Sequence, residues 1–200
     1  MKLPKKFNSR ENDHIRYEFT SPETGVRVKQ DFFVGRSHAV VAIIFAFTKE
    51  GPKVLITKRS KRMMDHPLYL SLPCGYLDWD ETRYEGMMRE VYEETSFYIP
   101  DSEEYMIYNN DGEPIIVKDK PTENRQNISS IYLLVFNFME EPEAFPSNVE
   151  DFKCKEVEWV RWMDMDDFDR QAINFNWAFN HDETIIKGFL HWNNLPYNKD

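Results

Sequence analysis

Apolar and polar positions follow one another along the chain in patterns that predict short strands and amphipathic helices. The longest apolar run, residues 39–47, is continuous, which is typical of a strand buried on both faces of a sheet. Shorter apolar runs predict further strands at residues 54–57, 128–138 and 157–162. Tyr84, Met87, Met88 and Val91 recur at helical spacing, so they predict a helix with one apolar face.

Turn residues predict two β-hairpins. Residues 14–19 and 26–34 flank the segment 21–25, which is rich in residues that break helices and strands. Residues 109–112, with the sequence Asn-Asn-Asp-Gly, separate two other apolar runs, so we expect a second hairpin there. Two later helices are predicted at residues 165–173 and 182–192.

The order of these elements indicates an α/β fold. Strands and helices mixed in this way predict a three-layer α/β/α sandwich around a mixed β-sheet. We expect residues 1–36 to form a tail and an N-terminal β-hairpin, and residues 37–200 to form one compact domain.

The acidic balance of the chain narrows the classes of partner. The 35 acidic and 25 basic residues give a net charge of -10, which repels a nucleic-acid backbone, so no duplex nucleic acid is expected as a partner. No apolar run is long enough for a membrane span, and no apolar segment follows the basic first residues. We therefore expect a cytoplasmic protein with no membrane partner. The strand edges of the N-terminal hairpin leave a homodimer open.

A cluster of glutamates lies on the helix that is expected to begin near Thr82. Thr82 and Glu85 have the spacing of a capping box. At about 100° per residue, Glu90, Glu93 and Glu94 share one arc beside the apolar face. Charged helix faces are usually just solvated, but neighbouring carboxylates repel each other by tenths of a kcal/mol. Because hard cations take oxygen ligands, we interpret this cluster as a divalent cation site.

The spacing of the whole segment 75–97 is more restrictive than a run of acids. It has the form G-x5-E-x7-R-E-U-x-E-E-x-G-U, where U is an apolar residue, with Gly75, Glu81 and Arg89 at fixed positions. The one departure is Ser96, where the pattern has glycine. The segment resembles the box of the Nudix hydrolase superfamily, and the order of strands across residues 39–192 also fits a Nudix-type sandwich.

The resemblance implies a role for each box residue. The implied metal ligands are the carbonyl oxygen of Gly75 and the carboxylates of Glu90, Glu93 and Glu94. Glu90 is also a candidate base for the attacking water, Glu81 supports the metal site, and Arg89 braces the loop against the helix. The implied cofactor is Mg²⁺, with Mn²⁺ as an alternative. The implied reaction is hydrolysis of the diphosphate linkage of a small-molecule nucleotide derivative, since a divalent cation neutralises the charges that repel a nucleophile.

Ser96 falls where the helix is expected to end. Helices often end in a left-handed turn, which costs a residue other than glycine about 1 kcal/mol. No implied metal ligand is lost, so we interpret Ser96 as a local cost in stability and not as the mark of an inactive enzyme.

Two weaker signals concern the substrate. Residues 58–62 form a basic cluster after a strand; such runs are usually solvated, and the alternative is contact with phosphate, for which Arg59 is the candidate substrate-binding residue. Residues 124–129 and 179–182 are similar to segments of the Nudix branch that includes ADP-ribose pyrophosphatases. This similarity favours ADP-ribose or a related nucleotide. His181 lies in the second of these segments, and a histidine in such a position is more often structural than catalytic.

Acidic residues after residue 138 are further candidates for a metal ligand or general base, as some Nudix enzymes take one from this region. They are Glu140, Glu141, Glu143, Glu150, Asp151 and Glu156. Their spacing does not indicate which one serves.

Two other functions remain as alternatives. A nucleotide-sensing Nudix module would bind its ligand without turnover, but it has no need for the full set of Glu81, Glu90, Glu93 and Glu94. An isopentenyl diphosphate isomerase uses a similar scaffold and a catalytic cysteine, and Cys74 is the residue that keeps this alternative open.

Overall fold

The chain forms two units, residues 1–37 and residues 38–200. The computed structural model describes residues 14–20, 27–33, 36–100, 105–120, 127–146, 156–166 and 168–196. In the first unit, β1 (His14–Thr20) pairs antiparallel with β2 (Arg27–Phe33), which is the predicted N-terminal hairpin.

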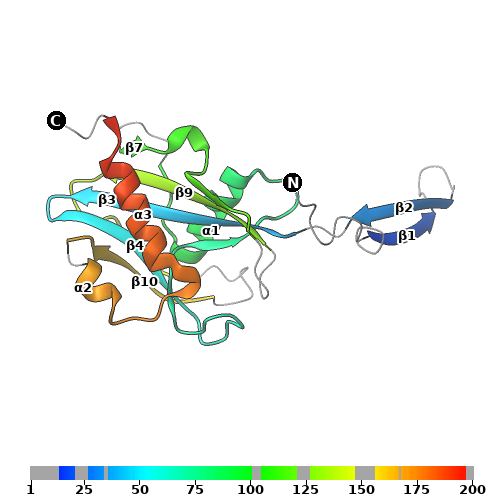
Figure 1. Cartoon of the computed structure of the whole chain (residues 1–200), viewed down its shortest axis with the longest axis horizontal. Helices are drawn as coiled ribbons and strands as arrows, with labels where there is room; N and C mark the ends of the chain where they lie inside the picture. Colours follow the sequence, from blue (N-terminus) through cyan, green and yellow to red (C-terminus); the bar gives the residue numbers. More distant parts are fainter. Residues whose placement is uncertain are drawn as a thin grey trace, which may run out of the picture. The chain divides into compact units, whose positions relative to one another are not determined.

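A mixed sheet forms the centre of the second unit (Figure 1). Its strands lie in the order β10-β4-β3-β9-β7. The central strand β3 (His38–Thr48) is antiparallel to β4 (Gly51–Arg59) and parallel to β9 (Ile128–Asn137). At one edge, β10 (Val157–Asp164) pairs with β4. Two short strands, β5 (Leu70–Ser71) and β6 (Cys74–Tyr76), pair with β4 and β3.

The second predicted hairpin is wrong. The two strands beside residues 109–112 are β7 (Met106–Tyr108) and β8 (Ile116–Lys118), and each pairs antiparallel with β9 instead of with the other. Since both oppose the same strand, they run in the same direction and cannot form a hairpin. The turn residues form a 3-10 turn, η2 (Asn110–Gly112), that carries the chain from one part of β9 to the next.

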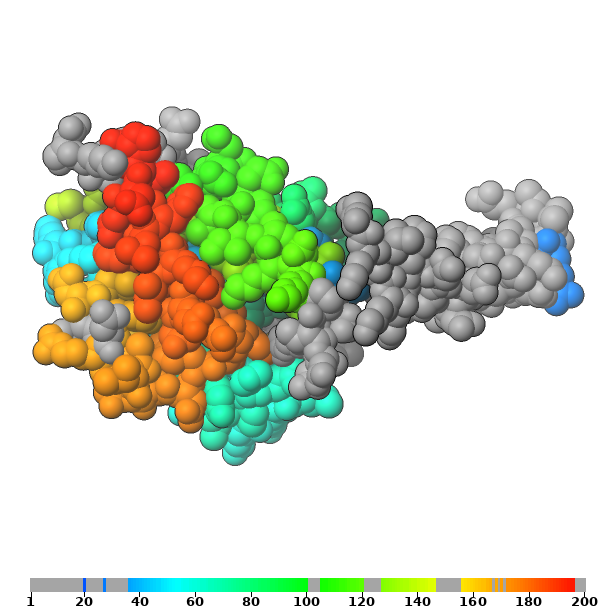
Figure 2. All heavy atoms as spheres, viewed as in Figure 1, coloured from blue at the N-terminus to red at the C-terminus, as the bar shows by residue number. Residues whose placement is uncertain are grey.

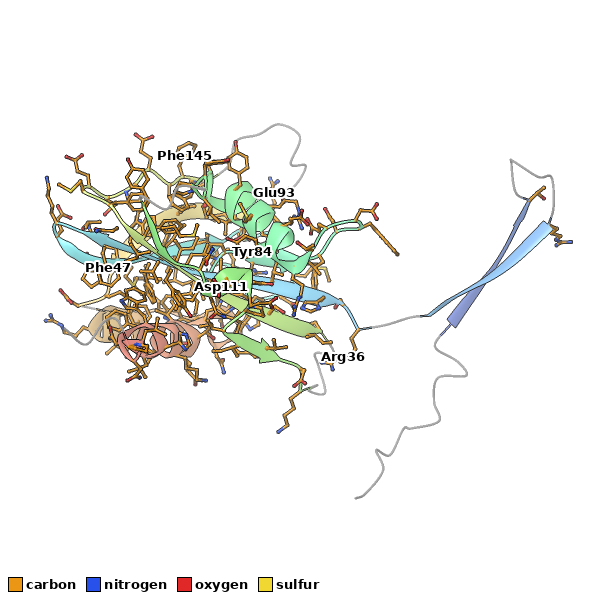
Figure 3. All side chains as sticks on the ribbon, turned by 90° about the horizontal axis from the view of Figure 1, so that it is seen from above. Arg36, Phe47, Tyr84, Glu93, Asp111 and Phe145 are labelled. Carbon is orange, nitrogen blue, oxygen red and sulfur yellow. The ribbon has the colours of Figure 1, made fainter. Side chains whose placement is uncertain are left out.

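Helices cover both faces of the sheet, so the fold has the predicted three layers (Figure 3). Alternate residues of β3 face opposite sides. Val40, Ala42 and Ile44 lie in the core under α1 (Arg83–Thr95). The intervening residues of β3 pack with α2 (Phe168–Ala172) and α3 (His181–Asn193). Figure 1 shows α3 crossing its face of the sheet, and in Figure 2 the atoms of α3, in orange and red, form part of the surface on that side. No helix in the described part of the chain has the length and hydropathy to cross a membrane.

Helix α1 begins and ends where the sequence predicts. Both bonds of the capping box are present: the Glu85 amide donates to Thr82 Oγ1 (3.2 Å), and the Thr82 amide donates to Glu85 Oε2 (2.8 Å). At the other end, Ser96 has φ 53° and its amide donates to the Tyr92 carbonyl. Ser96 therefore occupies the left-handed position that favours glycine.

This geometry predicts that Ser96→Gly stabilises the protein. Glycine adopts the left-handed conformation without the strain that a Cβ atom causes, so the free energy of unfolding should rise by about 0.5–1 kcal/mol. Urea unfolding measures the change. Ser96→Ala is the matched control, because it retains the Cβ atom and should bring no gain. A lower stability for Ser96→Gly would contradict the assignment.

Candidate active site

The guanidinium group of Arg89 lies at the centre of a carboxylate network on α1. Its Nη1 donates to Glu90 Oε1 (3.0 Å) and to Glu93 Oε2 (2.9 Å). Its Nε and Nη2 donate to the two oxygens of Glu81, at 3.0 and 2.8 Å. Nη2 also donates to the Tyr76 carbonyl oxygen (2.9 Å). These contacts use every N–H of the guanidinium, and the bonds to Glu81 above all hold the pKa of Arg89 above its ordinary value.

The network joins the loop before α1 to the helix itself. Glu81 accepts a hydrogen bond from the Asp78 amide (2.7 Å) in addition to those from Arg89. These bonds lower the pKa of Glu81, and those from Arg89 have the larger effect. Gly86 makes the close approach of the loop possible, because a Cβ atom there would lie 2.7 Å from Glu81 Oε1. Arg89 therefore joins the loop to the helix through its bonds to Glu81 and to the Tyr76 carbonyl.

Gly75 lies directly under the Glu90 carboxylate. A Cβ atom at position 75 would overlap the carboxylate carbon and both of its oxygens. Strand β6 holds Gly75 in register with Val40 of the central strand, so the loop cannot easily move away. The absence of a side chain at this position is thus what allows Glu90 to fold over the backbone.

Burial sets the charge state of the two inner carboxylates. It raises the pKa of Glu90 to about 7, against the opposing effect of Arg89. Burial also raises the pKa of Glu94 well above its ordinary value, and the nearby Glu90 raises it further. Glu94 Oε2 accepts from the Cys74 amide (3.1 Å), which favours the charged form but does not offset its burial.

The chemistry of these side chains fits a hard divalent cation. One oxygen of each carboxylate is used: Glu90 Oε1 and Glu93 Oε2 by Arg89, and Glu94 Oε2 by the Cys74 amide. The second oxygen of each has no hydrogen-bond partner among the described residues, so the cluster can offer three carboxylate oxygens. Within the same part of the chain, no group of three or more acidic, histidine or cysteine side chains is placed so that it could hold a metal ion as it stands. A cation would therefore have to draw the carboxylates together.

Among the described acids of the later region, Glu156 is the one that lies near this cluster. Its negative charge contributes to the raised pKa of both Glu90 and Glu94, so it lies near them. Glu156 is exposed and sits just before β10, and its carbonyl accepts from the Ser60 amide. Glu141, by contrast, forms an ion pair with Lys53 (2.7 Å). Glu150 and Asp151 lie outside the described residues. Spacing in the sequence could not separate Glu156 from the other acids, because the choice depends on how β10 pairs with β4.

Arg59 is buried at the end of β4. Its side chain is held by a bond from Nε to the Asp65 carbonyl (3.1 Å), and its guanidinium lies 5.0 Å from the centre of the Phe179 ring. Its charge lowers the pKa of Glu94 against the effect of burial, so Arg59 lies on the side of the carboxylate cluster. Arg125, in the other segment with similarity to ADP-ribose pyrophosphatases, lies outside the described residues.

Cys74 directly precedes Gly75 in the chain, and its thiol sulfur lies 3.6 Å from Ser71 Oγ. Burial raises the pKa of this thiol to about 12, and the charge of Glu94 adds to the effect. A thiol of this kind is a poor nucleophile at neutral pH, which weighs against the isomerase alternative.

Comparison with known proteins identifies the family. The model of the NUDIX domain matches residues 36–183, which is more than half of the chain. The protein therefore belongs to the NUDIX domain family.

Solved structures share the fold at low sequence identity. The NUDIX domain of Shewanella oneidensis NrtR, solved with ADP ribose, has a TM-score of 0.58 and 18% identity, over 80% of this chain and 90% of that chain. The Nudix hydrolase RenU from M. smegmatis has a TM-score of 0.55 and 16% identity, over 90% and 96% of the two chains. A bifunctional NMN adenylyltransferase/ADP ribose pyrophosphatase from Francisella tularensis has a TM-score of 0.58 and 19% identity, over 78% of this chain and 41% of its own length.

The network around Arg89 predicts that Arg89→Lys destabilises the fold. A lysine retains the charge but cannot reproduce the planar fork, so Glu81 loses its two-point contact with Arg89 and the Tyr76 carbonyl loses the Nη2 donor. Because Arg89 is partly exposed, we expect a loss of about 1–3 kcal/mol in the free energy of unfolding.

The matched control is Arg83→Lys on the same helix. Arg83 is more exposed, and among the described residues its side chain forms one ion pair, with Glu113 at 3.5 Å, so its replacement should change stability by less than about 0.5 kcal/mol. Urea unfolding of both variants decides the point, and equal losses would mean that the Arg89 fork has no special role.

Proposed function

We propose that this protein is a Nudix pyrophosphohydrolase that uses Mg²⁺ or Mn²⁺ to cleave the diphosphate linkage of a nucleoside diphosphate derivative. The observation that carries the proposal is the set of carboxylate oxygens of Glu90, Glu93 and Glu94 beside the Gly75 loop. Membership of the NUDIX domain family and the fold shared with Nudix hydrolases support the same reaction class.

The proposed mechanism assigns the cation to Glu90, Glu93, Glu94 and the Gly75 carbonyl. When bound there, the divalent cation supplies charge neutralisation at the diphosphate and activation of water. Arg89 keeps Glu90 and Glu93 oriented through its bonds to one oxygen of each. Glu81 holds Arg89 and thereby fixes the loop.

A proton acceptor for the attacking water, or a further ligand for the cation, must lie beside the cluster. Glu156 meets this requirement, because it is exposed and close enough to influence both inner carboxylates. We assign it the role of general base or of an additional cation ligand. Glu90, the base implied by the family resemblance, is the alternative, but its carboxylate is already engaged by Arg89.

ADP-ribose, or a nucleotide of similar form, is the substrate we propose. Similar folds have been solved with such ligands: the Shewanella domain with ADP ribose, and the Francisella protein with AMP and a Mn ion, the latter with a TM-score of 0.57 and 18% identity. Arg59 is the positively charged side chain that we assign to binding of the substrate phosphates. Its Nε is used by Asp65, while its terminal nitrogens have no hydrogen-bond partner within the described ranges.

A product assay tests the function directly. Purified protein should convert ADP-ribose or another nucleoside diphosphate derivative to a nucleoside monophosphate with Mg²⁺ or Mn²⁺, and EDTA should abolish the reaction. Mass analysis of a panel with dinucleotides, nucleotide sugars and nucleoside triphosphates identifies the leaving group. Tight binding of ADP-ribose by calorimetry without any product would replace the proposal with the sensing module.

Loss of an inner carboxylate should abolish activity without unfolding the protein. Glu94→Gln retains the acceptor for the Cys74 amide but removes a buried charge that repels Glu90. We expect the turnover rate to fall by about 10²–10⁴-fold while thermal stability is unchanged or higher. Glu183→Gln is the control, because Glu183 is exposed on α3 and pairs only loosely with Lys187 (3.7 Å). Full activity in Glu94→Gln would remove Glu94 from the site.

The role of Glu156 is tested against a neighbouring acid. Glu156→Gln should lower turnover by about 10²-fold or more, since it removes a proton acceptor or a ligand beside the cluster. Glu143→Gln should leave turnover unchanged, because no interaction with the carboxylate cluster is found for Glu143 in the described part of the chain. Equal rates for the two variants would assign the base elsewhere.

A further inference from the structure

His181 makes hydrogen bonds that link the start of α3 to the loop before Gly75. It is buried, with 3% of its surface exposed. Its Nδ1 accepts from the Leu72 amide (3.0 Å) and lies 3.1 Å from Ser71 Oγ. Because a backbone amide can only donate, Nδ1 must be the unprotonated nitrogen. The sequence separation of 109 residues shows that this contact depends on the tertiary fold.

A short chain of contacts leads from His181 to the inner carboxylates. Leu72 and Ser71 are followed by Pro73, whose ring fixes one backbone torsion and whose carbonyl accepts from Ala42 (3.0 Å). The next residue, Cys74, donates its amide to Glu94 Oε2, and Gly75 lies under Glu90. A displacement at Leu72 would therefore reach Glu94 and Glu90 through the three residues Pro73, Cys74 and Gly75.

The turn before His181 is strained in a way that aims its side chain. Phe179 and Asn180 both have positive φ, 59° and 56°, a costly conformation for a bulky aromatic residue. The same turn is fixed to β5, because the Leu70 amide donates to the Asn176 carbonyl (2.9 Å). In Figure 2 the turquoise segment around residues 60–70 lies next to the orange segment that leads into α3. Such strain persists only where the surrounding structure imposes it, and here it places His181 Nδ1 on the Leu72 amide.

We propose that His181 is a positioning residue for the cation site: its Nδ1 holds Leu72 and Ser71 so that the Cys74 amide and Gly75 meet Glu94 and Glu90. The proposal rests on the cation site of the proposed function. The partner of this buried Nδ1 is the backbone amide of Leu72, two residues before the amide that Glu94 accepts from. Phe179 extends the same role to Arg59, whose guanidinium lies against its ring (5.0 Å).

Two amide variants separate the acceptor from the packing. In His181→Asn, Oδ1 stands at the same distance along the side chain as Nδ1 and can accept from the Leu72 amide. In His181→Gln, the oxygen is one atom farther out, near the place of Nε2, and cannot reach it. His181→Ala removes the acceptor. Ile185→Ala and the milder Ile185→Val are the controls, because Ile185 is fully buried on the same helix and its apolar side chain has no hydrogen-bonding group.

Two measurements on these variants test the proposal. Amide hydrogen exchange by NMR on the metal-free protein reports whether Leu72 and Cys74 keep their bonds. Titration with Mn²⁺, followed by electron paramagnetic resonance of the free ion, gives the Kd of the cation site. We expect His181→Ala and His181→Gln to weaken Mn²⁺ binding by about tenfold or more and to speed exchange of the Cys74 amide by a similar factor. His181→Asn should stay within about threefold of the natural protein in both.

The outcomes distinguish this role from simple stabilisation. The Ile185 variants should lower Tm with little effect on Mn²⁺ binding or on the Cys74 amide. If His181→Ala changes the Mn²⁺ Kd and Cys74 exchange no more than an Ile185 variant with the same loss of Tm, the positioning role is overturned. If the natural protein binds no Mn²⁺, the proposed cation site fails, and the exchange of the Cys74 amide alone decides whether His181 positions the loop.

Discussion

Repulsion among carboxylates on one turn of α1 is the constraint around which this site is built. Arg89 counters it by donating to Glu81, Glu90 and Glu93 at once, so three negative charges share one cation. A shared guanidinium is effective because its donors lie in one rigid plane. The close loop at Gly86, the carboxylate over Gly75 and the fixed start of α1 all serve to keep that plane in contact with its acceptors.

Glu94 is the member of the cluster that Arg89 does not hold. It is buried, it accepts from a backbone amide, and its pKa is raised by burial and by Glu90. Arg89 thus offsets part of the charge of Glu81, Glu90 and Glu93, while burial opposes the charged forms of the inner part of the cluster, Glu90 and Glu94. An incoming divalent cation would gain most from the inner part, because it would relieve a cost already present in the folded chain. Arg59 and Glu156 approach this inner part from β4 and from the start of β10.

Features set by neighbouring residues were predictable from the sequence, and those set by pairing across the fold were not. The capping box at Thr82 and Glu85, the left-handed Ser96 and the central strand all follow from local pattern, as does the mixed α/β sandwich. The hairpin expected at residues 109–112 was wrong because β7 and β8 both pair with β9 and not with each other. Glu156 could not be chosen among six acids from the sequence, because its position depends on the pairing of β10 with β4. The contact of His181 with Leu72 could not be predicted either, because it joins residues 109 positions apart. Which box residues bind a cation stays a prediction.

The parallel pairing of β3 with β9 has a consequence for how the protein folds. His38 and Ser130, joined by a 2.8 Å contact between Nε2 and Oγ, are 92 residues apart, and everything between them forms a loop that must close before the pair can form. Closing such a loop costs entropy before any contact rewards it, which makes this the slow part of folding. Helix α1, with both capping bonds inside one turn, can form early. The glutamates of α1 are close in the sequence, so the helix can bring them together without closure of that loop, whereas their burial against the sheet depends on it.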